Sequence, residues 1–256
     1  MRLEATASNT QKKVSMLPFG SLLILSMAQT NTPRPLTATL IGATGLIGGH
    51  LLRLLQADPY FGTVRVLVRR PIGLQSPRTE EKLINFADVE SFRLGLEGSD
   101  VIFVAVGTTQ KKVGGDEAAY RKVDFDIPVA AARWGKEAGA RHLLLVSSVG
   151  ANAGSSNFYL RLKGQTEDAV KASGMEAVSV FRPSMLLGER KEARPGERIG
   201  QVASQLFSGL MMGGLRKYKP VLAELVAAAM IAQAKTGARG FHVFEYDAIR
   251  QLAGAR

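Results

Sequence analysis

A glycine-rich turn near the start of the chain constrains the fold more than any other sequence feature. The turn reads Gly-Ala-Thr-Gly-Leu-Ile-Gly over residues 42–48 and follows a short apolar run with β-branched residues at 38–41. Residues 46–56 then repeat apolar side chains on one face of a helix, namely Ile47, Leu51, Leu54 and Leu55. The pattern predicts a strand, a tight turn and a helix whose N-terminal N–H groups suit a phosphate.

The three glycines of this turn have different predicted roles. Gly42 allows the tight turn, Gly45 lets the backbone approach a pyrophosphate, and Gly48 permits close packing of the helix on the strand. The spacing is G-x-x-G-x-x-G, and such a turn by itself is also compatible with a purely structural role. In this context we expect cofactor contacts from the following residues: Gly42, Thr44, Gly45, Leu46, Ile47 and Gly48.

Short apolar runs and helical segments continue to alternate after this turn. We expect strands at 64–68, 83–86, 100–106, 142–147, 177–181 and 240–246, and helices at 118–137, 158–172, 222–234 and 247–252. This alternation predicts an α/β fold with a Rossmann-like, doubly wound parallel sheet over residues 37–256. The rhythm changes after Gly188, so a small C-terminal substrate lobe is expected around 189–220, with one helix at 199–212.

The first 36 residues stand apart from this pattern. We interpret residues 1–36 as an extension that is either disordered or the result of a wrongly assigned start. In the second case, Met27 is a suitable true start. Two lysines precede an apolar stretch from Val14 to Met27, which outlines a signal peptide. However, Pro18 interrupts the stretch, which is too short to span a bilayer. Because a redox cofactor is scarce outside the cell, we expect a cytoplasmic protein without a membrane span.

Composition excludes several classes of site. The chain has no cysteine, so disulfides, thiolate metal sites and a cysteine nucleophile are excluded. The three histidines, His50, His142 and His242, lie far apart, so no metal is expected. The net charge of +11 is spread along the chain without a block of like charges, so no nucleic-acid partner is expected.

Two arginines at the end of the second predicted strand indicate which cofactor binds. NAD-dependent enzymes usually place an acidic residue there for the ribose 2′-hydroxyl, whereas this chain has Arg69 and Arg70. A guanidinium pairs with a 2′-phosphate that a carboxylate would repel. The pattern therefore favours NADP(H) over NAD(H). The alternative is that both arginines are surface residues at a strand end without a role in cofactor binding.

A second group of residues indicates chemistry at a carbonyl or an alcohol. Ser147 and Ser148 end the fifth predicted strand, and Tyr159 and Lys163 follow on one helix face because they are four residues apart. A tyrosine hydroxyl near an ammonium can act as general acid or base, and a serine hydroxyl can orient the substrate. By itself, a Tyr-x-x-x-Lys pair usually marks only a helix face.

These stretches together resemble the short-chain dehydrogenase/reductase superfamily over about residues 37–253. The resemblance is strongest to the atypical branch that contains the human HIV Tat-interacting oxidoreductase-like protein. It is carried by GATGLIGG, VGTTQKKVG, YRKVDFDIP, LLLVSSVGA, SSNFYLRLKG, SVFRPSMLLGER and RPGE. The resemblance implies a Rossmann-like fold and NADP(H) binding.

The resemblance also implies roles for individual residues. Ser148, Tyr159 and Lys163 match the catalytic positions, and Lys163 would also hold the nicotinamide ribose. Further cofactor contacts are implied for the following residues: Gly107 and Thr108 after the fourth strand, Asp88 near the adenine, and Pro183 and Ser184 beside the nicotinamide. Many members of the superfamily have a catalytic asparagine where this chain has Asp124, and the added charge changes the proton relay.

The expected function is that of an NADP(H)-dependent oxidoreductase acting on a small carbonyl, quinone or alcohol, as a monomer or homodimer. Two alternatives stay open at this point. One is a redox-sensing or regulatory protein that binds NADP(H) with little turnover. The other is a sugar-nucleotide epimerase or dehydratase, although the short region after Gly188 argues against a large sugar-nucleotide pocket.

Overall fold

Seven parallel strands form the central sheet of this protein. The computed structural model describes residues 35–188 and 213–254. The strands are β1 (Leu36–Ile41), β2 (Phe61–Val68), β3 (Thr79–Leu83), β4 (Val101–Val104), β5 (His142–Val146), β6 (Ala177–Phe181) and β9 (Gly240–Phe244). Their order is β3-β2-β1-β4-β5-β6-β9, with every neighbouring pair parallel. The predicted Rossmann-like topology is therefore confirmed.

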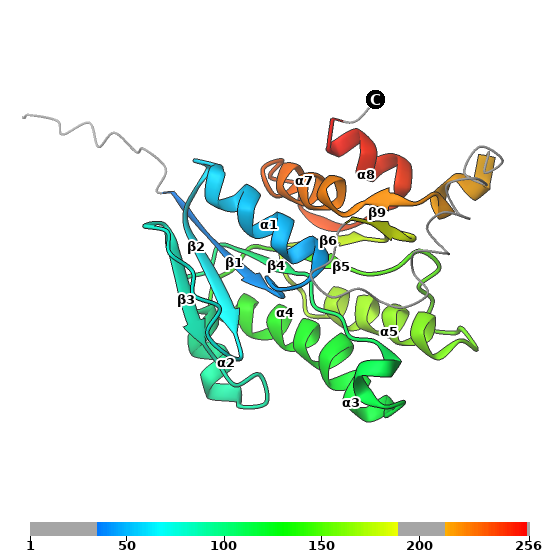
Figure 1. Cartoon of the computed structure of the whole chain (residues 1–256), viewed down its shortest axis with the longest axis horizontal. Coiled ribbons are helices and arrows are strands. Elements are labelled where there is room, and N and C mark those ends of the chain that lie inside the picture. The colour runs from blue at the N-terminus through cyan, green and yellow to red at the C-terminus, as the bar shows by residue number, and fades with distance from the viewer. Residues whose placement is uncertain (1–34, 189–212, 255–256) are drawn as a thin grey trace, which may run out of the picture. The chain divides into compact units, whose positions relative to one another are not determined.

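Helices cover both faces of the sheet, as Figure 1 shows. One face carries α1 (Leu46–Ala57), α7 (Ala223–Ala234) and α8 (Tyr246–Leu252), and the other carries α2 (Val89–Leu96), α4 (Ile127–Glu137) and α5 (Phe158–Ala172). Successive strand residues enter opposite cores: Leu40 packs with α1 and α7, and Ile41 packs toward α2 and α4. The central strands are apolar in sequence because both of their faces are buried.

The third strand lies elsewhere than the sequence predicted. The expected strand at 83–86 is wrong, because β3 occupies Thr79–Leu83 at the edge of the sheet. Its sequence, Thr-Glu-Glu-Lys-Leu, is polar, as is common for edge strands that face water. The apolar residue Ile84 is buried after the strand has ended.

The helix predicted at 118–137 is a single helical run with an irregular centre. It begins as α3 (Glu117–Arg121), where the Asp116 carboxylate accepts hydrogen bonds from the N–H groups of Ala118 and Ala119 at 2.8 and 3.1 Å. A π-helical turn, η2 (Lys122–Asp126), then leads into α4. Such wide turns are rare, and they occur often at functional sites.

A small two-stranded sheet follows β6. Its strands, β7 (Leu186–Leu187) and β8 (Val221–Leu222), are parallel. A 3-10 helix, η4 (Gly213–Tyr218), precedes β8, and another, η1 (Gln110–Val113), follows β4. Most of the predicted substrate lobe, including the helix expected at 199–212, lies outside the described residues. Residues 1–34 also lie outside them, and Leu36 already belongs to β1.

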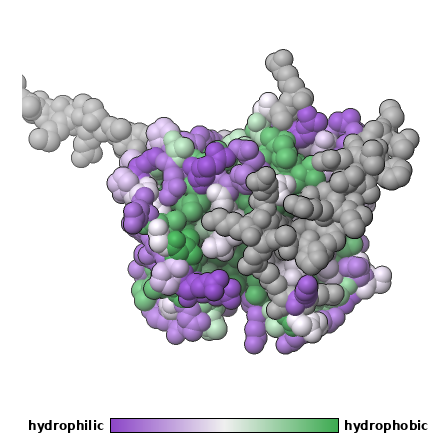
Figure 2. All heavy atoms as spheres, viewed as in Figure 1, coloured by the Kyte–Doolittle hydropathy of each residue, from purple (hydrophilic) through white to green (hydrophobic). Residues whose placement is uncertain are grey.

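The face drawn in Figure 2 is largely hydrophilic, with smaller hydrophobic areas between the polar side chains. Within residues 35–188 and 213–254, no helix combines the length and apolarity needed to cross a bilayer. The same residues contain no group of three or more His, Asp or Glu side chains arranged to hold a metal ion.

Candidate cofactor and catalytic site

The glycine turn lies where the strand order reverses, since β1 pairs with β2 on one side and β4 on the other. Gly42 has a φ of +98°, and a Cβ there would lie 2.7 Å from the carbonyl carbon of Ala105 after β4. A Cβ on Gly48 would lie 1.9 Å from the carbonyl oxygen of Gly42. The turn thus packs backbone directly on backbone, as a phosphate-binding turn requires.

The start of α1 offers N–H groups to an anion. Gly45 is the N-cap residue and has no side-chain capping bond, and no acidic residue occurs in the first turn. The N–H groups of Gly45 and Gly49 are used within the turn, on the carbonyl oxygens of Gly42 and Gly45 at 3.0 and 2.8 Å. Thr44 is exposed and Ile47 is buried. These residues fit a dinucleotide pyrophosphate bound through backbone N–H groups and the helix dipole.

The residues predicted to bind the adenosine half follow β2 and β3. Arg69 and Arg70 come directly after β2 and are exposed. Asp88 is also exposed, and its carboxylate caps α2 by accepting the N–H of Ser91 at 2.8 Å. The carboxyl ends of parallel strands share one sheet edge, so these residues lie on the same edge as the glycine turn. Their contacts with a cofactor remain predictions.

The segment after β4 is attached to η2 through Asp124. The N–H of Thr108 donates to Asp124 Oδ2 at 2.8 Å, and the Tyr120 hydroxyl donates to the carbonyl of Thr108 at 3.1 Å. Gly107 lies next to the same carboxylate, because a Cβ there would be 3.6 Å from Asp124 Oδ1. The helical run at 117–137 therefore fixes the loop predicted to touch the cofactor.

Asp124 and Lys163 form a buried ion pair. Lys163 Nζ lies 2.8 Å from Asp124 Oδ1, and the side chains are only 7% and 1% exposed. Burial alone would lower the pKa of Lys163, but attraction to Asp124, and more weakly to Tyr159 and Glu167, raises it above its ordinary value. Lys163 therefore stays an ammonium at neutral pH. Asp124 uses one carboxylate oxygen on the N–H of Thr108 and the other on Lys163.

Tyr159 lies on α5 one turn before Lys163 and is 36% exposed. Lys163 Nζ is 5.9 Å from the centroid of its ring, and the buried ring of Tyr120 packs edge-on against it at 6.4 Å. The structure thus brings the predicted tyrosine and lysine together on one helix face. The phenol reaches solvent while the ammonium behind it does not.

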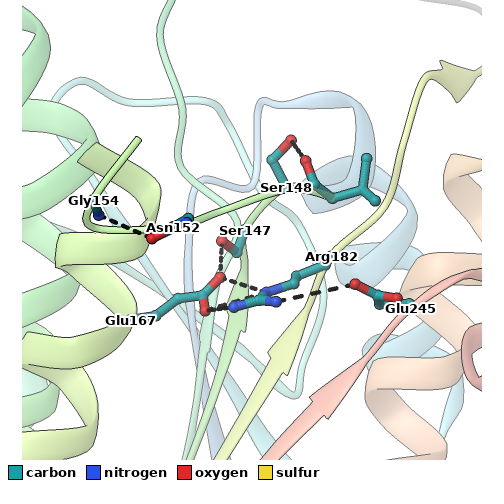
Figure 3. Close-up of polar contacts among 8 residues, drawn as sticks. Ser147, Ser148, Asn152, Gly154, Glu167, Arg182 and Glu245 are labelled. Carbon is teal, nitrogen blue, oxygen red and sulfur yellow. Dashed lines mark hydrogen bonds and ion pairs between the residues drawn. The ribbon is translucent and has the colours of Figure 1, made fainter. Parts of the chain in front are cut away.

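Gly164 allows a loop to cross α5 directly beside Lys163. A Cβ on Gly164 would lie 2.1 Å from the backbone nitrogen of Ala153 and 2.3 Å from the carbonyl carbon of Asn152. Asn152 also folds the loop on itself, since its side chain accepts the N–H of Gly154 at 2.9 Å (Figure 3). The loop joining β5 to α5 is therefore packed closely onto the helix that carries Tyr159.

The two serines after β5 point in different directions, as Figure 3 shows. The Ser148 hydroxyl, the predicted catalytic group, makes only a long 3.4 Å contact with the carbonyl of Val149. The Ser147 hydroxyl instead donates to the buried carboxylate of Glu167. Ser148 is therefore the serine whose hydroxyl can turn toward a ligand.

Glu167 and Arg182 lie beside the candidate site residues, and the sequence interpretation did not single them out. Glu167 accepts two bonds from Arg182 Nε, at 3.0 and 3.2 Å, and one from a terminal guanidinium nitrogen at 2.5 Å. The available signal was spacing, because Glu167 follows Lys163 by four residues and so continues the face of Tyr159. No spacing rule could supply its partner Arg182, which follows β6.

The residues after β6 complete this edge of the sheet. Pro183 is buried and its carbonyl accepts the N–H of Val149 at 3.0 Å, which joins the ends of β5 and β6. The Ser184 hydroxyl donates to the carbonyl of Lys219, ahead of β8. Gly188 meets the start of α1, since a Cβ there would lie 3.2 Å from the Leu46 side chain. Contacts of Pro183 and Ser184 with a nicotinamide remain predictions.

Comparison with known proteins supports this description. Residues 42–210 match the NAD(P)H-binding family. The chain is 37% identical over 184 residues to "Protein fmp52, mitochondrial" of Aspergillus fumigatus, covering 68% of this chain and 78% of that protein. It is 30% identical over 216 residues to "Protein HTATIP2" of Rattus norvegicus, covering 83% and 87%.

A solved structure has a similar fold. MoeE5, in complex with UDP-glucose and NAD, superposes with a TM-score of 0.61 at 18% identity, covering 86% of this chain and 83% of that chain. At this identity the likeness concerns the fold alone.

The relatives correct the expectation of a cytoplasmic location, which is wrong. Several matching relatives, from Aspergillus fumigatus, Candida albicans and Aspergillus clavatus, are named as mitochondrial proteins. Scarcity of a redox cofactor outside the cell argues against secretion, but it does not separate the cytoplasm from an organelle. The match over residues 42–210 and the HTATIP2 relative together show that the chain belongs to the NAD(P)H-binding family, in an atypical short-chain dehydrogenase/reductase branch like that of HTATIP2.

Proposed function

We propose that this protein is an NADP(H)-dependent oxidoreductase that acts on a small carbonyl, quinone or alcohol. The observation that carries the proposal is the pairing of an exposed phenol, Tyr159, with the buried ammonium of Lys163 one helical turn away. Both lie at the same sheet edge as a glycine turn that fits a pyrophosphate. A proton donor and a dinucleotide site thus belong to one surface of the fold.

The proposed reaction divides the work between the cofactor and this chain's side chains. When bound, NADP(H) supplies or accepts the hydride. Tyr159 gives a proton to the substrate oxygen in reduction, or takes it in oxidation. Lys163, held by Asp124, keeps a positive charge near the phenol and the nicotinamide ribose, and the Ser148 hydroxyl orients the substrate oxygen.

The preference for NADP(H) over NAD(H) rests on Arg69 and Arg70. Both are exposed at the end of β2, where a 2′-phosphate would lie and where a carboxylate would serve the 2′-hydroxyl of NAD. Titrating the protein with NADPH and NADH tests this preference directly. Equal or tighter binding of NADH would overturn it.

One observation favours a second candidate, a redox-sensing or regulatory protein that binds NADP(H) with little turnover. Asp124 places a full negative charge 2.8 Å from the Lys163 ammonium, where many superfamily members have a neutral amide. The carboxylate offsets the positive charge of the ammonium that lies beside the phenol. Turnover is therefore expected to rise in Asp124→Asn if this charge restrains the chemistry.

The decisive experiment follows NADPH oxidation by the purified protein with a panel of aldehydes, ketones and quinones, and NADP⁺ reduction with a panel of alcohols. We expect the wild type to turn over at least one class and Tyr159→Phe to lose at least about a hundredfold in rate, as for removal of a general acid. If the wild type and Tyr159→Phe are equally inert while NADPH still binds, the sensing function replaces the enzymatic one.

A mitochondrial location is proposed from the relatives and from composition. Residues 1–36 contain four Lys or Arg residues, eight Ser or Thr residues and one acidic residue, a balance found in organelle targeting segments. Fractionation of cells expressing the full chain and a variant beginning at Met27 tests this. Equal distribution of the two forms would exclude residues 1–26 as the signal.

A further inference from the structure

A partly buried ion pair one helical turn beyond Lys163 connects three segments of the candidate site. The Glu167 side chain is 4% exposed and the Arg182 side chain 24%. Glu167 belongs to α5, Arg182 follows β6, and the Ser147 hydroxyl, after β5, donates to the same carboxylate (Figure 3). Ser147, Glu167 and Arg182 are called the α5 clamp below.

The geometry of the α5 clamp is specific. The guanidinium of Arg182 donates through Nε and a terminal nitrogen to both carboxylate oxygens of Glu167, a forked arrangement that fixes direction as well as distance. The backbone N–H of Arg182 donates to the carbonyl of Phe244 at 2.8 Å, and another guanidinium nitrogen lies 4.0 Å from Glu245. The arginine is therefore held on β9 as well as on α5.

Each member of the α5 clamp lies next to a predicted site residue. Ser147 directly precedes Ser148, and Glu167 lies one turn after Lys163 on the same helix face. Arg182 directly precedes Pro183, whose carbonyl accepts the N–H of Val149. Buried apolar side chains of similar volume often stabilise a fold as well as a buried ion pair does, so stability alone does not account for these charges.

We propose that Glu167 and Arg182 are positioning residues, whose ion pair sets Ser148, Lys163 and Pro183 at fixed distances from one another. This inference rests on the proposed oxidoreductase function. None of the clamp residues needs to touch the substrate. Without the pair, β5, α5 and β6 would keep their hydrogen bonds but lose the side-chain link at the edge where the reaction would occur.

Three substitutions test the clamp. Glu167→Gln keeps the shape and an acceptor for Ser147 but removes the charge, Arg182→Met removes the donors, and Arg182→Lys keeps the charge without the fork. We expect Glu167→Gln and Arg182→Met to lower kcat about tenfold or more, since small misplacements of reacting groups are costly. The KM for NADPH should change less, because the glycine turn is unaltered. Arg182→Lys should recover part of kcat.

A matched control separates positioning from general loss of an ion pair. Glu80→Gln removes the partner of Arg65, whose side chain is 10% exposed and which lies on β2, away from the clamp. We expect wild-type kcat in Glu80→Gln at temperatures where both variants are folded. An equal loss of kcat in Glu80→Gln and Glu167→Gln would overturn the proposal.

A second readout does not depend on turnover. In ¹⁵N-labelled protein without ligand, the amide signals of Ser148, Lys163 and Ser184 should shift in Glu167→Gln and Arg182→Met but not in Glu80→Gln. Unchanged amide signals together with unchanged kcat would overturn the inference. If the wild type consumes no NADPH, the proposed function fails, and the amide signals alone decide about the clamp. If Glu167→Gln does not fold, Arg182→Met and Ser147→Ala carry the same comparison.

Discussion

The glycine turn and the inner face of α5 lie at the same sheet edge but are built in different ways. The turn at 42–48 uses backbone almost alone, with carbonyl oxygens and N–H groups in contact where side chains would be. The face of α5 uses charged side chains, with Lys163 on Asp124 and Glu167 on Arg182. The turn depends on glycines, which have no Cβ, and the face of α5 depends on pairing between charged side chains.

The difference teaches where each region is vulnerable. A backbone-built turn has no charge to unbalance, so it should fail when a Cβ is added and tolerate changes of pH. A charge-built face has room for isosteric side chains, so it should keep its shape but respond to the loss of one charge. The following four predictions test this division, from the largest expected effect to the smallest.

Gly48→Ala should have the largest effect. Its Cβ would lie 1.9 Å from the carbonyl oxygen of Gly42, and neither backbone segment can move without shifting β1 or α1. We expect the free energy of unfolding to fall by about 3 kcal/mol or more. Chemical denaturation measures this loss, and NADPH titration should find no binding.

Gly49→Ala is the matched control for that substitution. Its Cβ would have only one ordinary contact, 3.8 Å from the carbonyl oxygen of Ala43, so alanine should stabilise α1 by about 0.5–1 kcal/mol through helix propensity. If Gly48→Ala were as stable as Gly49→Ala, the close packing of the turn would be disproved.

Asp124→Asn should affect the charge-built face without changing its shape. The amide can still accept from Lys163 or the N–H of Thr108, but the buried ammonium loses its counter-charge. We expect the free energy of unfolding to fall by about 2–3 kcal/mol, at the low end of what an unpaired buried charge costs. Asp126→Asn, an exposed neighbour on η2, is the control and should be neutral. Equal denaturation midpoints for the two variants would contradict the buried pair.

Acid should destabilise the sheet at His142, the first residue of β5, and not the glycine turn, which has no titratable group. Burial, with a smaller repulsion from His242, lowers the pKa of His142 to about 4, and its ring bonds to Ser179 at 2.9 Å. A lowered pKa means that the unfolded chain binds the proton more tightly. The contribution to stability is therefore complete above pH 6.5 and is lost as the pH falls toward 4.

The size of this acid effect is about 2 kcal/mol between pH 7.5 and pH 5. Denaturation at a series of pH values measures it in the wild type and in His142→Gln, which removes the titrating ring. The slope in this range should be shallower for the variant. Parallel profiles would show that His142 is not responsible.

Replacing Arg69 and Arg70 by serine should have the smallest effect of the four. Both side chains are exposed, so stability should not change, while NADPH should bind about tenfold more weakly and NADH as before. A variant with Arg133 and Arg239 replaced by serine loses the same two charges at other exposed positions. Weaker NADPH binding in both variants would indicate an effect of overall charge and not of a 2′-phosphate site.

The fold could be predicted well wherever local pattern and burial agree. The helix at 158–172 and the strand at 177–181 have the predicted bounds, because capping residues and glycines mark their ends. The strand expected at 83–86 failed because an edge strand is selected by hydrogen bonding to β2 and not by apolarity. The π-helical turn η2 was also missed, since a single wide turn shifts the apolar repeat of a long helix only slightly.

The sequence by itself determined the backbone-built part of this protein, because glycine spacing, strand apolarity and helix periodicity are local properties. Those properties placed the turn, the alternating sheet and the Tyr159–Lys163 face. Only the tertiary structure decided the charge partners, since Asp124 lies 39 residues before Lys163 and Arg182 lies 15 residues after Glu167. Which charged side chains meet depends on how β5, α5 and β6 pack at one sheet edge. No local sequence pattern encodes this pairing.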